Sequence, residues 1–121
     1  MSKIRGATLG LVAGFALASA LPALAHQNRA AATVTVTAGK PAEFHFTLSP
    51  SSVKHGSVTF KVSNKGKLAH DFSINGKKTS LIQPGKSASL TVTFAKAGSY
   101  PYKCTVPGHA AAGMKGTLKV S

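Results

Sequence analysis

Acidic residues are nearly absent from this 121-residue sequence. Glu43 and Asp71 are the only two, against 15 lysine and arginine residues, which gives a formal net charge of +13 at pH 7. Catalysis by a pair of carboxylates, as in most glycoside hydrolases, is therefore disfavoured, because it would need both of them. The excess positive charge favours acidic partners, and their association should weaken as salt is added.

Cysteine occurs once, at Cys104. An internal disulfide is thus excluded, although small exported domains often depend on one for stability. A single thiol in an oxidising compartment is a liability unless it is buried, paired with another chain, or bound to a metal. A metal would both protect the thiol and add folding free energy.

Long apolar runs are missing except near the N-terminus. Lys3 and Arg5 precede an apolar run over residues 7–21, and residues 22–25 (PALA) contain an A-x-A cleavage pattern. Because a membrane span needs about 20 apolar residues, we predict a signal peptide over residues 1–25 rather than an uncleaved anchor. Its removal lowers the net charge from +13 to +11, because Lys3 and Arg5 leave with it. The mature protein would then be exported, periplasmic or otherwise extracytoplasmic, without an integral membrane span.

The mature chain is long enough for one domain. Residues 26–32 (HQNRAAA) show no period and are predicted to be a flexible tail, so the domain would span residues 33–121. His26 would become the N-terminus, where an imidazole and a free amine can chelate copper. A frayed tail is the favoured interpretation, and the second copper site stays an alternative.

Helical periodicity is missing from the mature part. Apolar and polar residues instead alternate in short segments, at residues 33–37, 43–48, 57–62 and 87–94. This alternation, with β-branched and aromatic residues, is typical of strands that bury one face. Turn residues separate the segments, and Asn75-Gly76 predicts a tight hairpin. We therefore predict an all-β protein, an antiparallel sandwich or barrel.

Residues 100–120 are the most informative about function. They contain Cys104, His109 and Met114 at C-x4-H-x4-M spacing, with glycines and a proline in the intervening turns. A strand would deliver the thiol, and two turns would bring the imidazole and the thioether to the same end of the sheet. Two histidines and a cysteine in a plane, with a weak axial methionine, form a blue-copper site. This ligand set would need one more histidine.

His70 is the preferred second histidine, because it lies between the polar loop at residues 64–69 and the start of a strand. His45 and His55 compete with it. His45 falls on the polar side of an alternating segment and His55 in a polar turn, so both are predicted to be solvated. Asp71 should point away from its neighbour His70 in a strand. It is predicted either to support a ligand or to lie at the surface.

These motifs resemble the cupredoxin family. The matching pieces are NKG and HDF at residues 64–66 and 70–72, and YKCTVPGH and GMKG at residues 102–109 and 113–116. The strand pattern extends the likeness over residues 33–121, and the loop is most similar to those of rusticyanin and auracyanin.

The resemblance implies a Greek-key β-sandwich and one type 1 copper ion that cycles between Cu(I) and Cu(II). The implied metal ligands are His70, Cys104, His109 and Met114. The family often has Asn or Ser after the upstream histidine, where this chain has Asp71. How the Cys104 sulfur is hydrogen-bonded is therefore left open.

A soluble one-electron carrier is the leading hypothesis, with copper storage or delivery as the alternative. We expect a monomer that meets acidic redox proteins transiently, through a basic rim of Lys65, Lys67 and Lys115 and a small apolar patch at residues 110–112. An enzyme is not expected, since a copper oxidase adds further ligands and a zinc hydrolase needs an open position. Nucleic-acid binding is not expected either, because no aromatics interleave a basic stripe.

Overall fold

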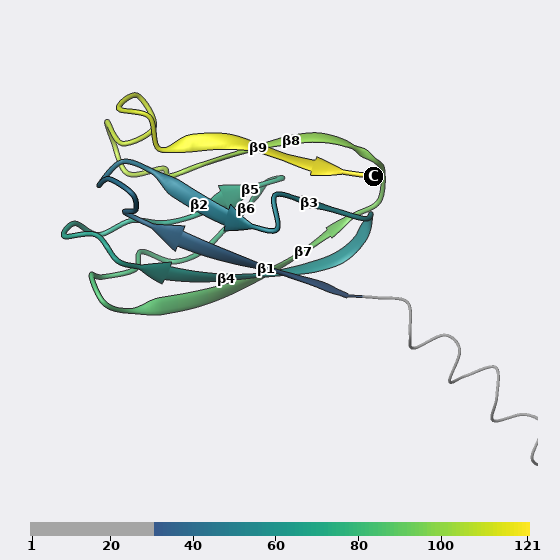
Figure 1. The fold of residues 1–121 in the computed structure, drawn as a ribbon, viewed down its shortest axis with the longest axis horizontal. Coiled ribbons are helices and arrows are strands. Elements are labelled where there is room, and N and C mark those ends of the chain that lie inside the picture. Colours follow the sequence, from purple (N-terminus) through teal and green to yellow (C-terminus); the bar gives the residue numbers. More distant parts are fainter. Residues whose placement is uncertain (1–30) are drawn as a thin grey trace, which may run out of the picture. The chain divides into compact units, whose positions relative to one another are not determined.

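The computed structural model describes residues 31–121 (Figure 1). The predicted signal peptide and residues 26–30 of the predicted tail, including His26, lie outside the described residues. Among residues 31–121, no helix is long and apolar enough to cross a membrane.

Two β-sheets pack face to face in the described part of the chain (Figure 1). One sheet has the strand order β2 (Phe46–Ser49), β1 (Ala32–Ala38), β4 (Gly56–Asn64) and β7 (Ser87–Phe94). The other has the order β3 (Ser52–Val53), β9 (Lys115–Val120), β8 (Gly98–Lys103), β5 (Ser73–Ile74) and β6 (Lys77–Lys78). Neighbouring strands are antiparallel, except that β1 runs parallel to β4 and β3 parallel to β9. The predicted all-β sandwich is confirmed.

The core lies between the sheets and consists of the apolar side chains that alternate along the strands. Val58, Phe60 and Val62 of β4 are 0–1% exposed, and their polar neighbours face outward. Phe60 packs against Phe72 with ring centroids 5.2 Å apart, and Phe46 meets the same ring edge-on at 5.3 Å. Such aromatic pairs contribute about 0.5–1.5 kcal/mol each beyond their buried area. A core filled in this way leaves the ends of the strands free to carry functional loops.

Local predictions hold at the hairpin and are wrong at one strand start. Asn75 and Gly76 connect β5 to β6 with φ angles of 51° and 78°, as the predicted tight turn requires. The predicted strand over residues 43–48 begins only at Phe46. Glu43 lies instead in a turn, where it is partly buried. Alternation of polar and apolar residues persists through this turn, which is why the pattern alone placed Glu43 in a strand.

Candidate metal centre

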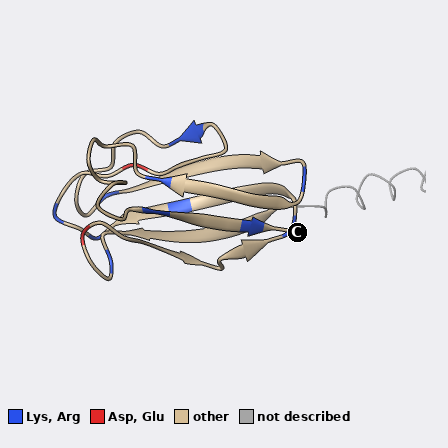
Figure 2. Cartoon of the chain, turned by 90° about the horizontal axis from the view of Figure 1, so that it is seen from above, with Lys and Arg blue, Asp and Glu red and all other residues tan. Residues whose placement is uncertain are grey.

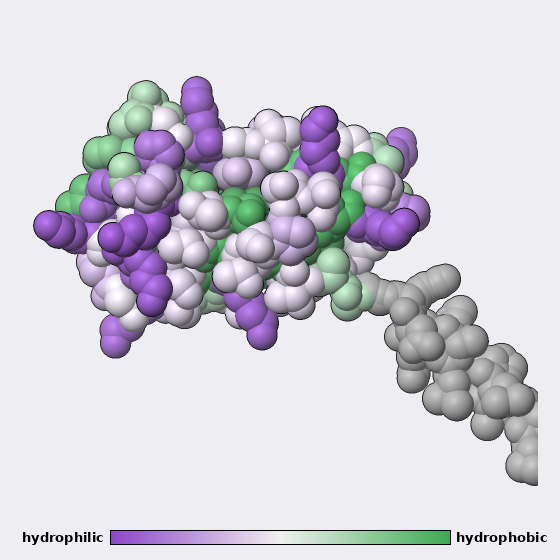
Figure 3. Space-filling model, in the orientation of Figure 1, coloured by the Kyte–Doolittle hydropathy of each residue, from purple (hydrophilic) through white to green (hydrophobic). Residues whose placement is uncertain are grey.

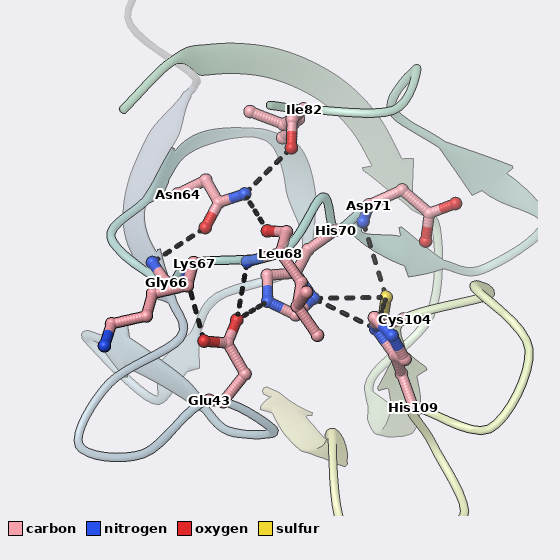
Figure 4. A network of polar contacts seen from close by, with 10 residues as sticks. All are labelled: Glu43, Asn64, Gly66, Lys67, Leu68, His70, Asp71, Ile82, Cys104 and His109. Atoms are coloured by element: carbon pink, nitrogen blue, oxygen red, sulfur yellow. Dashed lines mark hydrogen bonds and ion pairs between the residues drawn. The ribbon is translucent and has the colours of Figure 1, made fainter. Parts of the chain in front are cut away.

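Three of the four predicted ligands meet at one end of the sandwich. His70 precedes β5, Cys104 follows β8, and His109 lies in the loop between β8 and β9. The two Nδ1 atoms are 3.1 Å apart, and Cys104 Sγ lies 3.6 Å from Nδ1 of His109 and 3.9 Å from Nδ1 of His70 (Figure 4). Protein nitrogen and thiolate ligands lie about 2.0–2.3 Å from a metal such as zinc. The three donor atoms are therefore spaced to bind a single ion.

Burial shifts the pKa values of two of these donors, Cys104 and His109, in opposite directions. Cys104 is 1% exposed, and burial raises the pKa of its thiol, so metal binding has to displace a proton. Burial, together with the neighbouring His70, lowers the pKa of His109, which keeps that imidazole neutral at neutral pH. A neutral imidazole has a lone pair available for a metal. A soft sulfur beside two imidazoles is the donor set that suits copper.

Met114 lies in the same buried cluster as Cys104. Its side chain is fully buried, and the cluster is completed by Ala38 and by partly buried Phe44, Phe46 and Val106. The Cys104 amide donates to the Met114 carbonyl at 3.1 Å, so the two backbones are directly linked. The structure thus places Met114 beside the thiol, and ligation by its thioether stays a prediction.

The loop that carries His109 is closed by its own hydrogen bonds. The His109 amide donates to the Val106 carbonyl, and the Met114 amide donates back to the His109 carbonyl. Gly108 and Gly113 have φ angles of 85° and 118°, a backbone region that suits glycine. These turns hold His109 opposite His70 with its side chain partly exposed.

Asp71 supports the thiol through its backbone. Its amide donates to Cys104 Sγ at 3.4 Å, which identifies the sulfur hydrogen bond that the sequence left open. Its carboxylate accepts from the Thr105 amide at 2.6 Å and from the Thr105 hydroxyl. Asp71 is 6% exposed, so of the two predicted placements the structure selects support of a ligand and not the surface.

Glu43 is a residue that sequence reasoning missed. Its Oε2 lies 2.6 Å from Nε2 of His70, on the side of the ring away from Cys104 and His109 (Figure 4). Backbone amides of Lys67 and Leu68 donate to the carboxylate and, with the Lys67 bond as the largest cause, lower the pKa of Glu43. The only signal in the sequence was the rarity of acids.

The competing histidines lie outside this cluster. His45 is exposed just before β2. His55 is exposed between β3 and β4, and its Nδ1 lies 3.0 Å from the carbonyl oxygen of Ser121. Among the described residues, the group of possible metal-binding side chains contains His70, Cys104 and His109. Neither His45 nor His55 is part of it.

Comparisons with known proteins agree with the donor set. A family profile described as copper binding proteins of the plastocyanin/azurin family matches residues 26–121. The chain is 55% identical over 40 residues to the copper-resistant cuproprotein CopI of Pseudomonas aeruginosa. It is 49% identical over 43 residues to auracyanin-B of Chloroflexus aurantiacus. These segments cover 33% and 36% of this chain, but only 22% and 18% of the two relatives.

Solved structures with the same fold include auracyanin and rusticyanin, the two proteins whose loops this sequence resembles. Auracyanin B superposes with a TM-score of 0.67 at 27% identity, covering 76% of this chain and 89% of that chain. Rusticyanin from Thiobacillus ferrooxidans superposes with a TM-score of 0.56 at 27% identity, covering 75% and 77%. The likeness therefore extends over the sandwich and is not confined to the loop.

Proposed function

Because this chain belongs to the plastocyanin/azurin family of copper-binding proteins, we propose that it carries single electrons between redox partners. Its cofactor is copper, which supplies a Cu(I)/Cu(II) couple when bound. The predicted cupredoxin resemblance and fold are confirmed by the family match and the superpositions. The proposed ligands are His70, Cys104, His109 and Met114.

One observation carries this proposal: the donor atoms of two imidazoles and one thiol converge at one end of the sandwich. His70 Nδ1, His109 Nδ1 and Cys104 Sγ lie 3.1–3.9 Å apart. His70 is fixed by paired backbone hydrogen bonds with Ile82, and Cys104 by its bond to Met114. Ligands that the fold holds in place by such bonds should rearrange little between oxidation states, which favours fast electron transfer.

The direct test is a visible spectrum of the purified protein titrated with Cu(II). We expect an intense thiolate-to-copper band that saturates at one equivalent, is bleached by a mild reductant, and returns on reoxidation. Cys104→Ser should abolish the band, because it removes the thiolate. A folded wild-type protein without the band, or a band that survives Cys104→Ser, would contradict the proposal.

Copper storage or delivery is a second candidate, favoured by the similarity to a protein named for copper resistance. The two functions differ in how firmly the metal is held. A carrier should keep copper through many redox cycles, whereas a delivery protein should pass Cu(I) to an acceptor. Repeated cycling in the presence of a Cu(I) chelator, followed by metal analysis, separates them: retention supports the carrier, and loss supports delivery.

Partners of such a carrier would be acidic proteins that bind briefly. All 12 lysines of residues 31–121 lack an acidic partner within ion-pair distance. Several lie on loops at the end that carries the site, where blue segments gather in Figure 2. The pale green area of moderately apolar side chains in Figure 3 coincides with the loop between β8 and β9. A small apolar area with a basic surround suits weak, transient docking.

We further propose an exported, non-enzymatic protein that works as a monomer. The basis for export is the predicted signal peptide over residues 1–25. The non-enzymatic role is supported by residues 31–121, in which one group of His and Cys side chains is spaced to hold a metal, since an oxidase needs additional copper sites. Mass spectrometry of the protein secreted by its native host would test the cleavage after Ala25.

A further inference from the structure

We propose that Glu43 is a positioning residue of the copper site, which fixes the tautomer of His70 and strengthens it as a ligand of Cu(II). The inference rests on the copper site proposed above. Glu43 and Asp71 are the only acids in the chain, and their carboxylates have different partners. Asp71 binds Thr105, whereas Glu43 binds the ring of a proposed ligand.

The first step concerns the proton on the His70 ring. Glu43 Oε2 lies 2.6 Å from Nε2, and an ionised carboxylate can only accept a hydrogen bond. Nε2 therefore carries the hydrogen, and Nδ1 keeps its lone pair. That lone pair faces Cys104 Sγ and His109 Nδ1, where the metal would lie (Figure 4). The ring is fully buried, so water does not compete for either nitrogen.

The second step concerns how the carboxylate is held. The amide of Lys67 donates to Oε1 at 2.8 Å, and the amide of Leu68 donates to Oε2 at 3.2 Å. A Cβ built on Gly66 would overlap Oε2 and lie 3.1 Å from Nε2 of His70. A glycine at position 66 thus leaves room for the carboxylate to reach the ring. The loop amides and the Glu43 carboxylate together fix the orientation of this imidazole.

The third step concerns charge. Within residues 31–121 no lysine ammonium lies within 4.0 Å of the Glu43 carboxylate, so its negative charge is not neutralised by an ion pair with lysine. A carboxylate on the outer nitrogen raises the basicity of a metal-bound histidine. A more basic ligand and a nearby negative charge both favour Cu(II) over Cu(I). Glu43 should therefore hold the reduction potential below the value that a neutral partner would give.

The test compares Glu43→Gln with the wild-type protein by voltammetry and copper competition. Glutamine removes the charge and keeps one of the two acceptor oxygens, which can face the His70 ring and the Leu68 amide while the Lys67 amide loses its acceptor. Loss of a residue that supports a metal ligand typically costs about 10–100-fold in metal affinity. We expect a loss of this size for Cu(II) and a smaller one for Cu(I). Every tenfold difference between the two losses corresponds to about 59 mV of higher potential.

Asp71→Asn is the matched control, because it removes the other negative charge near the site without touching a ligand ring. We expect it to raise the potential less than Glu43→Gln does. Equal shifts, or no shift in Glu43→Gln, would overturn the proposed role, since Glu43 would then act as a distant charge or as a loop brace only.

A second measurement needs no copper. In the metal-free protein, ring nitrogen NMR shifts of His70 should report a hydrogen on Nε2, and Glu43→Ala should give a mixture of tautomers. A hydrogen on Nδ1 in the wild-type protein would overturn the inference. Because this result is obtained on the apo form, it separates a failure of the Glu43 assignment from a failure of the copper site.

Discussion

Cys104 is the residue through which pH should act on copper binding. Burial raises the pKa of its thiol above the ordinary value of about 8.5, so the thiol is protonated at pH 6–8 and must lose its proton to bind the metal. The affinity for copper should therefore rise with pH, by about tenfold per unit from this residue. Competition titrations at several pH values check the slope. An affinity that does not change between pH 6 and 8 would show that the thiolate is already formed in the apo protein.

Met114 is the second residue whose substitution should change a property of the copper site. Met114→Gln should keep copper bound but lower the reduction potential, because an amide oxygen stabilises Cu(II) better than a thioether does. Voltammetry of the two copper-loaded proteins measures the shift. The opposite signs expected for Met114→Gln and Glu43→Gln make a useful pair, since general damage to the site would not move the potential in two directions. An unchanged or higher potential in Met114→Gln would argue against axial ligation.

The loop at residues 64–69 is the element on which the position of His70 depends. Its anchor is Asn64, which is fully buried and donates to the carbonyl oxygens of Leu68 and Ile82, each at 2.8 Å. The Asn64 side-chain oxygen accepts from the Gly66 amide at 2.9 Å. One side chain thus ties the loop to the segment at Ile82, which pairs with His70.

Removal of this anchor should destabilise the whole domain. Asn64→Ala removes the side-chain partners of the Leu68 carbonyl and the Gly66 amide and one of the two donors to the Ile82 carbonyl, and we expect a loss of about 2–3 kcal/mol in the free energy of unfolding. Urea denaturation of the apo protein measures it. Ser63→Ala is the control one residue away, because its hydrogen bond to Ser87 is exposed, and it should change stability by less than about 0.5 kcal/mol. Similar losses in both variants would contradict the anchoring role.

Elements with a regular period could be predicted from the sequence, and contacts between distant turns could not. Alternation located the strands β1, β4 and β7 to within about two residues, because one face of each strand is buried. The spacing of Cys104 and His109 indicated their convergence for a similar local reason. Glu43 reaches His70 across 27 positions, through a turn that looks like a strand in the sequence. No local pattern encodes such a contact, which depends on how two loops pack.

At the scale of the whole molecule, the location of the lysines should matter more for association with a redox partner than their number. Lys103 and Lys115 are direct partners across β8 and β9, both are exposed, and each is adjacent in sequence to a proposed ligand. Lys54 and Lys96 are exposed near the opposite ends of the strands. A nine-residue strand such as β4 spans about 30 Å, or roughly three Debye lengths at 0.1 M salt. Only the first pair should influence a partner at the copper end.

A comparison of two double variants with equal net charge tests this expectation. Lys103→Gln with Lys115→Gln should slow electron transfer to hexacyanoferrate(III), an anionic oxidant, several-fold at low salt. Lys54→Gln with Lys96→Gln should have little effect. As the ionic strength rises, the stopped-flow rates of all the proteins should converge, since salt screens exposed charges. Equal slowing by both pairs would mean that net charge, and not its location, governs the encounter.

The loop between β8 and β9 also indicates which part of the domain can be changed by engineering. Its polar backbone groups are largely satisfied within the segment, from the Cys104 amide on the Met114 carbonyl to the bonds among residues 106–113. It enters and leaves the sandwich through paired strand ends, Lys103 opposite Lys115. The loop thus carries three of the four proposed ligands on its own hydrogen bonds, while His70 and the amide of Asp71 come from the rest of the domain. Changes in the length or sequence of this loop should therefore alter the electronic properties of the metal while the two sheets that present it stay the same.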